Sequence, residues 1–176
     1  IRSLEHHAQP VPLGEKGEVC VRGPQVMPGY WQNPAATEET FVDGWLRTGD
    51  VGYQDEDGYT FLVDRLKDVI LCSGYNVYPR AIEEALYLHE QIAEVTCIGV
   101  PDPYRGQAPK AFVRLKDGVT DITAEDLRAF LDDKISRIEM PREIEIREEL
   151  PKTMVGKLSK KELVEEERLK REGTRQ

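Results

Sequence analysis

The chain has 176 residues, of which 39% are hydrophobic, enough for a packed core in one domain or in a small domain with an appendage. Its 33 acidic and 24 basic side chains give a formal net charge of -9, which excludes a general affinity for nucleic acid or anionic membranes. No apolar run approaches the roughly 18 residues of a transmembrane helix, and the N-terminus lacks a signal-peptide pattern, so we expect a globular, cytoplasmic protein.

Neither the cysteines nor the histidines indicate a metal site. Cys20, Cys72 and Cys97 are odd in number and lie in or beside apolar, strand-like runs, so we expect reduced, structural thiols. His6 and His7 are adjacent and cannot share the helix face on which two ligands stand at i and i+4, which favours a solvated loop. We therefore predict no metal-binding residues in this chain.

The first part of the chain has the pattern of a β-rich unit. Residues 18–22 predict a short strand, and Asn33 followed by proline predicts the capped start of a short helix. Residues 52–54 and 59–63 flank a turn that contains glycine, so we expect them to form a hairpin. We place this unit at residues 1–66.

From Lys67 onward, strands alternate with helices. Strands are expected at 68–72, 95–100, 111–116 and 143–147, and helices after Tyr78, from Thr123 and from Ser159. The predicted fold class is α+β: a small β-rich unit is followed by a compact domain, at 67–176, with a short hairpin and a three-stranded sheet flanked by helices.

Two patterns in this domain predict which faces meet solvent. Ala111, Val113 and Leu115 alternate with Phe112 and polar residues, and Ile144 and Ile146 alternate with charged ones, so each strand should have one core face. On the last helix, Glu166 with Lys170 and Glu167 with Arg171 stand at i, i+4, which predicts a solvated face.

Four positions could carry chemistry. Asp50 follows Gly49 in a tight turn, where it could form an Asx turn or accept hydrogen bonds from a ribose diol. The donor fork of Arg65 suits ribose or phosphate oxygens, although a surface ion pair would explain it equally. Gly74 lacks a Cβ, so it could serve a turn or let another chain pass close to the backbone.

Lys157 ends the segment PKTMVGK at 151–157. A phosphate-binding P-loop is excluded because the first glycine of its motif is missing and Leu158 replaces the Ser or Thr that would bind magnesium. On its own, Lys157 could be an ordinary exposed lysine.

In order and spacing, several segments together resemble the adenylate-forming enzyme superfamily, and most closely its fatty acyl-CoA ligases. These segments are GEVCVRGPQVMPGYWQNP at 17–34, LRTGD at 46–50, DRLKD at 64–68, SGYNVYP at 73–79 and PKTMVGK at 151–157. Asp64 departs from the glycine of many relatives, which is typical of the fatty-acid and aryl-acid branches, and Lys67 stands where aspartate is common.

The resemblance implies a role for each candidate residue. Asp50 and Arg65 would bind the nucleotide, and Lys67 would be the hinge about which the C-terminal domain rotates between two half-reactions. Ser73, Gly74 and Tyr75 would line the path of the pantetheine arm of CoA. Lys157 would be the catalytic residue, bridging the substrate carboxylate and the α-phosphate of ATP.

The resemblance also implies substrates and partners. A fatty acid, ATP with Mg²⁺ and CoA would give acyl-CoA, AMP and diphosphate through an acyl-adenylate, with the Mg²⁺ ligands upstream of Ile1. Residues 1–66 would end a large AMP-binding domain and 67–176 would be its mobile C-terminal domain, so the 176 residues alone should be inactive. Residues 1–66 would then be loosely held or cover apolar surface by forming a homodimer.

Three alternatives stay open at this point. A carrier-protein-loading adenylation domain shares the same Asp, Arg and Lys residues but is usually followed by a carrier domain. A luciferase-like enzyme would form the adenylate without using CoA. A non-catalytic α+β interaction module would not need Asp50 or Lys157.

Overall fold

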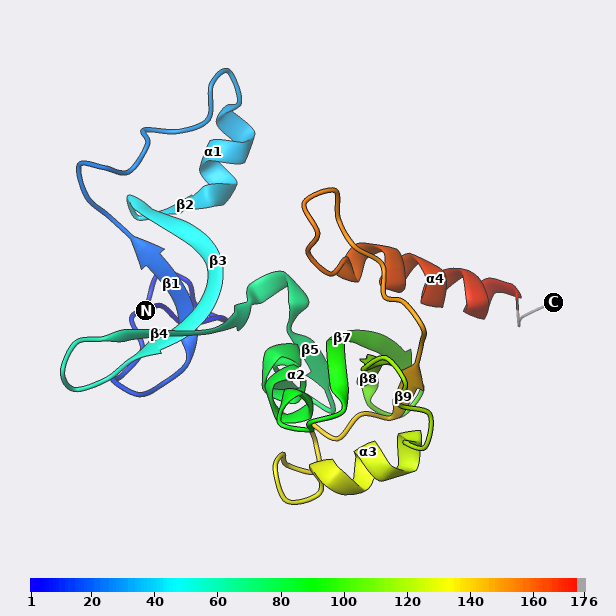
Figure 1. The fold of residues 1–176 in the computed structure, drawn as a ribbon. Helices are drawn as coiled ribbons and strands as arrows, with labels where there is room; N and C mark the ends of the chain where they lie inside the picture. The colour runs from blue at the N-terminus through cyan, green and yellow to red at the C-terminus, as the bar shows by residue number, and fades with distance from the viewer. Residues whose placement is uncertain (174–176) are drawn as a thin grey trace. The chain divides into compact units, whose positions relative to one another are not determined.

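The computed structural model describes residues 1–173, and its chain divides into two compact units, Ile1–Lys67 and Asp68–Gln176 (Figure 1). None of the helices among residues 1–173 is long and apolar enough to cross a bilayer. Across the same residues, no group of three or more His, Cys, Asp or Glu side chains is arranged to hold a metal ion.

The first unit is built on one antiparallel sheet. Its elements are β1 (Gly17–Val21), α1 (Pro34–Thr40), β2 (Phe41–Val42), β3 (Trp45–Gln54) and β4 (Thr60–Arg65). The long β3 pairs with each of the other three strands. The predicted hairpin is confirmed as β3–β4, and the predicted helix start is confirmed because the side chain of Asn33 accepts a hydrogen bond from the N–H of Ala36 at 3.1 Å.

The first unit buries little apolar surface of its own. Among residues 1–67, Val51 is the one buried hydrophobic residue. Trp31 is 88% exposed, and five further large side chains are also exposed: Leu13, Tyr30, Tyr59, Phe61 and Leu62. Exposed apolar surface of this extent is typical of a region that packs against other protein.

The second unit contains a five-stranded sheet between helices. The 3₁₀ turn η1 (Leu66–Asp68) spans the boundary between the units. The elements of the second unit are β5 (Ile70–Cys72), β6 (Tyr75–Val77), α2 (Pro79–Tyr87), β7 (Ile92–Asp102), β8 (Gly106–Leu115), α3 (Ala124–Leu131), β9 (Glu143–Ile146) and α4 (Lys160–Gly173). The order is β6-β5-β8-β7, and β9 pairs with β8 in parallel. The α+β class is confirmed; the β5–β6 hairpin joins the other three strands through the pair Cys72 and Gly106.

Both faces of this sheet are covered. Helices α2 and α3 pack on one face through Ile82, Leu86 and Leu127, all fully buried, and this larger core also contains the thiols of Cys72 and Cys97. Helix α4 covers the opposite face through a smaller core (Figure 1), whose buried members are Ile98, Val100, Phe112, Leu150 and Leu163. The prediction of reduced, structural thiols is confirmed for the two cysteines of this unit, which are free and buried.

The prediction of a single core face on β8 was therefore wrong. Phe112 is fully buried because Leu163 of α4 packs over it. The prediction that β9 has one core face holds for Ile144, which is 6% exposed. It does not hold for Ile146, at the end of β9, which is 36% exposed.

The predicted solvated face of α4 holds only in part: the side chains of Glu166 and Lys170 are 43% and 52% exposed, but that of Glu167 is only 12% exposed. Glu166 binds Arg147 of the segment after β9 at 2.8 Å, and Glu167 binds Lys110 of β8 at 3.0 Å. Glu167 does contact its own helix, but through Lys170 at i, i+3. These glutamates face the sheet because α4 docks there through Leu163.

Candidate functional site

The two predicted nucleotide contacts lie directly opposite each other in the first unit. Asp50 on β3 and Arg65 on β4 are cross-strand partners, and Arg65 Nε lies 3.1 Å from Asp50 Oδ1. The Arg65 side chain is 56% exposed and that of Asp50 is 28% exposed. The hairpin thus places a partly exposed carboxylate and an exposed guanidinium side by side, where both can reach a ligand.

Hydrogen bonds fix the turn before Asp50 without using its carboxylate. The hydroxyl of Thr48 donates to the carbonyl of Val19 at 2.8 Å and accepts from the N–H of Asp50 at 3.1 Å. Within the described residues, the carboxylate of Asp50 accepts no backbone hydrogen bond and is paired with Arg65, so the Asx-turn alternative is wrong. The carboxylate stays available to Arg65 and to a ligand.

The buried carboxylate of Glu18 is a second support that the sequence did not reveal. Glu18 is 1% exposed. It accepts hydrogen bonds from Arg47 Nε at 2.8 Å and from the N–H of Gly49 at 3.2 Å. This role could not be predicted from a charged residue in a short strand, since the two contacts form only when β1 pairs with β3.

Lys67, the predicted hinge, lies at the centre of the single turn η1 and is exposed to solvent. The boundary between the two compact units falls directly after it.

The predicted CoA-binding residues form the tip of the β5–β6 hairpin. Ser73 and Gly74 make the two-residue loop with φ of +52° and +82°, a conformation that favours glycine. The N–H of Ser73 donates to the carbonyl of Arg105 at 2.8 Å. A Cβ added to Gly74 would meet no atom within 4 Å, and Tyr75 is 65% exposed, so the tip is open to a passing ligand.

A cationic pocket lies in the same unit and was missed from the sequence. It has a volume of about 610 Å³, and its charged lining residues are Asp102, Arg105, Arg128, Asp132, Arg137 and Arg142. Hydrogen bonds from the backbone of Arg105 and Tyr104 lower the pKa of Asp102, and Arg142 pairs with it at 2.9 Å. The four arginines are scattered along the chain among acidic residues, so the sequence contains no basic cluster that would predict this pocket.

Lys157 stands at the end of an exposed loop, residues 153–157. The N–H of Thr153 donates to the carbonyl of Lys157 at 2.7 Å, and the N–H of Lys157 donates to Thr153 Oγ1 at 3.2 Å. Within residues 1–173 the ammonium of Lys157 makes no hydrogen bond or ion pair. The loop therefore presents a cation that is free to bind an anionic ligand.

A further charged cluster lies under α4, and its members satisfy one another. The ammonium of Lys110, 3% exposed, lies 2.8 Å from Glu143, 2.8 Å from Glu145 and 3.0 Å from Glu167. Burial by itself would lower the pKa of Lys110, but these three carboxylates raise it. Burial by itself would raise the pKa of Glu145, but hydrogen bonds from Lys110 and Arg147 lower it to about 2. This cluster ties α4 and β9 to β8.

Comparison with known proteins places these features in a family. Residues 81–157 match the AMP-binding enzyme C-terminal domain. The chain is 52% identical over 153 residues to a long-chain-fatty-acid–CoA ligase of Bacillus subtilis (strain 168), a match that covers 87% of this chain and 27% of the relative. The chain thus spans about a quarter of the length of this curated relative.

Two solved structures show the same fold at substantial identity. The amide bond synthetase McbA from Marinactinospora thermotolerans is 41% identical, with a TM-score of 0.84 over 94% of this chain and 33% of that one. The O-succinylbenzoate coenzyme A synthetase MenE from Bacillus subtilis, in complex with ATP and magnesium ion, is 33% identical, with a TM-score of 0.76 over 85% of this chain and 30% of that one. The chain therefore belongs to the AMP-binding enzymes and corresponds to their C-terminal part.

Proposed function

We propose that this chain acts within a longer ATP-dependent fatty acid–CoA ligase. Residues 1–66 would end its large AMP-binding domain, and residues 67–176 would form its mobile C-terminal domain, with Lys67 as the hinge. The 52% identity to a long-chain-fatty-acid–CoA ligase supports this assignment. The observation that carries it is the unpaired ammonium of Lys157 on its exposed loop.

In the first half-reaction, a carboxylate oxygen of the fatty acid attacks the α-phosphorus of ATP. A bond forms between that oxygen and the phosphorus, and the bond to the bridging oxygen breaks, which releases diphosphate and leaves the acyl-adenylate. Both reactants are anionic and repel each other as they meet, and negative charge builds on the α-phosphate oxygens and on the departing diphosphate. The ammonium of Lys157 would bridge the carboxylate and the α-phosphate and so stabilise that charge.

Asp50 and Arg65 would hold the nucleotide. A carboxylate accepts two hydrogen bonds from the vicinal hydroxyls of a ribose, and the guanidinium beside it supplies donors for ribose or phosphate oxygens. Magnesium bound to ATP would neutralise phosphate charge, as the MenE complex with ATP and magnesium suggests. The described residues of this chain offer no set of ligands for that ion, so other parts of the longer enzyme would hold it.

In the second half-reaction, the sulfur of CoA attacks the carbonyl carbon of the acyl-adenylate, and the carbon–oxygen bond to AMP breaks. The open tip at Ser73, Gly74 and Tyr75 would let the pantetheine arm pass. The cationic pocket is connected to this tip through the hydrogen bond from Ser73 to Arg105. Because its arginines suit phosphate groups, we propose that it takes the phosphates of CoA.

The test is diphosphate release by the full-length enzyme with a fatty acid and MgATP. Lys157→Ala should slow release by about 10²- to 10³-fold, by analogy with the removal of one oxyanion donor. Lys161→Ala, which removes an exposed ammonium from the start of α4, is the matched control and should leave the rate unchanged. Equal rates for Lys157→Ala and the unmodified enzyme would refute the proposal.

One further measurement separates the ligase from the other adenylate-forming enzymes. AMP release that depends on added CoA supports the ligase, whereas AMP release without CoA supports a carrier-loading, luciferase-like or amide-forming enzyme. The similarity to the amide bond synthetase McbA makes this control necessary.

A further inference from the structure

The loop that carries Lys157 has an ion pair on each of its two stems. On the entering stem, Lys152 Nζ lies 2.6 Å from Glu94 Oε1 on β7. On the leaving stem, Lys160 Nζ lies 2.8 Å from Glu83 Oε1 on α2. The two stems also pair with each other, through the antiparallel bridge between Lys152 and Leu158.

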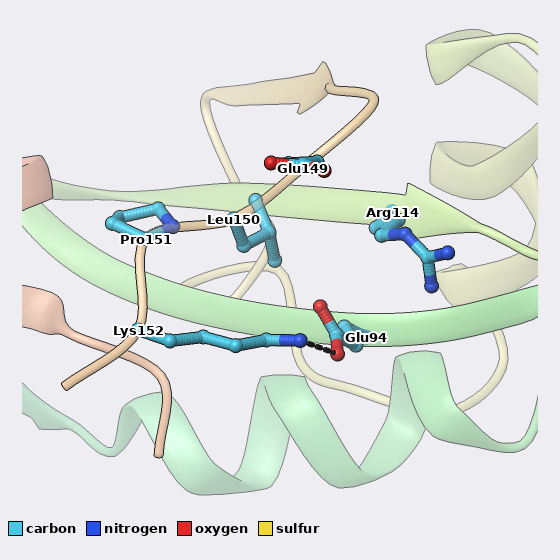
Figure 2. Close-up of a pocket in the computed structure, with 6 residues that line it drawn as sticks. All are labelled: Glu94, Arg114, Glu149, Leu150, Pro151 and Lys152. Carbon is cyan, nitrogen blue, oxygen red and sulfur yellow. Dashed lines mark ion pairs between the residues drawn. The ribbon is translucent and has the colours of Figure 1, made fainter. Parts of the chain in front are cut away.

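Both glutamates are held in place by the fold. Glu83 is 17% exposed and accepts a hydrogen bond from the N–H of Cys97 at 2.8 Å. The side chain of Glu94 is 22% exposed. It lines a pocket of about 500 Å³ with Arg114, Glu149, Leu150, Pro151 and Lys152. Figure 2 shows the side chain of Lys152 extending toward Glu94. Among the described residues, Glu94 Oε2 is buried without a hydrogen-bond partner, so the carboxylate depends on Lys152.

The tip of the loop has no such support. Met154 is fully exposed and Val155 is 79% exposed, so their side chains pack against little of the described chain. Apolar packing holds only the base of the loop, through the buried Leu150 and the half-buried Leu158. The direction in which the tip projects therefore depends on the two ion pairs of the stems.

From this geometry we propose that Glu94 and Glu83 are positioning residues for Lys157. Together with Lys152 and Lys160 they form a clamp, defined as these two ion pairs, that fixes the loop against β7 and α2. The inference rests on the proposed role of Lys157 in adenylate formation. A catalytic group that is displaced by about 1 Å can lose a large part of its effect, so the clamp would act on the rate of that step.

The first experiment measures the clamp without using activity. Hydrogen exchange of the full-length enzyme is followed in peptides that cover residues 150–159, where the backbone N–H groups of Thr153, Gly156, Lys157 and Ser159 donate hydrogen bonds. Glu94→Gln keeps the shape of the side chain and removes its charge. We expect exchange in this segment to rise by about threefold to fivefold, which corresponds to the loss of one partly exposed ion pair.

The matched control is Asp117→Asn, which removes the exposed partner of Arg114 beside the same pocket. It should leave exchange at residues 150–159 unchanged. The double variant Glu94→Lys with Lys152→Glu restores an ion pair of opposite sense and should restore protection. Unchanged exchange in Glu94→Gln, or no recovery in the double variant, would overturn the clamp.

The second experiment separates positioning from general stability. Adenylate formation and thioester formation from supplied acyl-adenylate are measured in single-turnover reactions, since Lys157 is proposed to act only in the first. Glu94→Gln should slow the first step about threefold to fivefold and leave the second unchanged, and Glu83→Gln with Glu94→Gln should slow the first about tenfold or more. Equal slowing of both steps would overturn the positioning role. If the unmodified enzyme forms no adenylate, the proposed function fails, whereas the exchange measurement still decides whether the clamp exists.

Discussion

Lys110 provides a test of how the second unit is held together. Its ammonium is 3% exposed and lies within 3.0 Å of the carboxylates of Glu143, Glu145 and Glu167. Methionine keeps the unbranched stem of lysine and removes the charge. We expect Lys110→Met to make the second unit easier to unfold, because α4 and β9 lose the cation that both of them bind on β8.

The size of the effect follows from how well each carboxylate is hydrated. Breaking a buried ion pair costs about 3–5 kcal/mol when it leaves a charge unpaired. Glu143 is 57% exposed and can be hydrated, whereas Glu167 is only 12% exposed. Lys170 stays 2.9 Å from Glu167, and Arg147 stays 2.7 Å from Glu145, so each of these two carboxylates keeps one cation. We therefore expect the lower end of the range, about 3 kcal/mol at pH 7.

The pH dependence of this loss has a definite sign. The pKa of Glu145 falls from 4.5 to about 2 on folding, so its contribution to stability is complete above pH 4.5 and is lost as the pH falls toward 2. The pKa of Lys110 is raised above 10.5, so its contribution is complete below that value and is lost as the pH rises through the raised pKa. The difference between the unmodified chain and Lys110→Met should be constant from about pH 5 to about pH 10 and should shrink in acid.

Urea unfolding followed by far-ultraviolet circular dichroism measures this difference. Both tryptophans, Trp31 and Trp45, lie in the first unit, so their fluorescence reports separately on residues 1–67. Arg168→Met on α4 is the control, since its partners Glu165 and Glu172 are exposed, and it should change stability far less. A loss below about 1 kcal/mol at pH 7 for Lys110→Met, or a loss that grows at pH 3, would refute the reasoning.

Three other changes test separate parts of the chain. Gly74→Leu places a side chain in open space at a φ of +82°, and its control Gly118→Leu does the same at +84°. Each should cost about 1 kcal/mol of stability in thermal denaturation. Only Gly74→Leu should block thioester formation while sparing adenylate formation. Asp50→Ala should raise the KM for ATP about tenfold in diphosphate-release assays, because a charged hydrogen-bond acceptor is lost; an unchanged KM would remove Asp50 from the site. Thr123→Ala should lower stability by about 1 kcal/mol in the same thermal assay, because Thr123 Oγ1 caps α3 by accepting from the N–H of Asp126 at 3.2 Å; no change would contradict the cap.

The elements with strong local signals were predictable from the sequence. Asn33 and Thr123 both cap the helices that their positions predicted, and Pro79 is the first residue of α2. The cross-strand pairing of Asp50 with Arg65 does not follow from the hairpin turn alone. The register shifts by one residue between Val51 and Gly52, and without that shift Asp50 would face Asp64.

Contacts between distant segments were not predictable in this way. Phe112 was assigned to the polar side of β8 because alternation alone gives no sign that a helix far along the chain covers that side. The ion pairs of Glu166 with Arg147 and of Glu167 with Lys110 were missed for the same reason. The i, i+4 rule identifies partners within one helix and gives no information about partners on other segments. The arginine pocket was missed because its members come from four separate positions, none with a distinctive local pattern.

Three lysines in one short segment show what the fold adds to a sequence motif. Lys152, Lys157 and Lys160 are similar in sequence terms, yet the first is bound by Glu94 and the last by Glu83. The two paired lysines have carboxylates beside them that neutralise their charge and hold the side chains against the domain. Within the described part of the chain, Lys157 has no carboxylate partner, and it projects from the loop that the other two support. Its charge is thus available to a carboxylate or a phosphate brought by a substrate, and the paired lysines on either side determine where that charge is held.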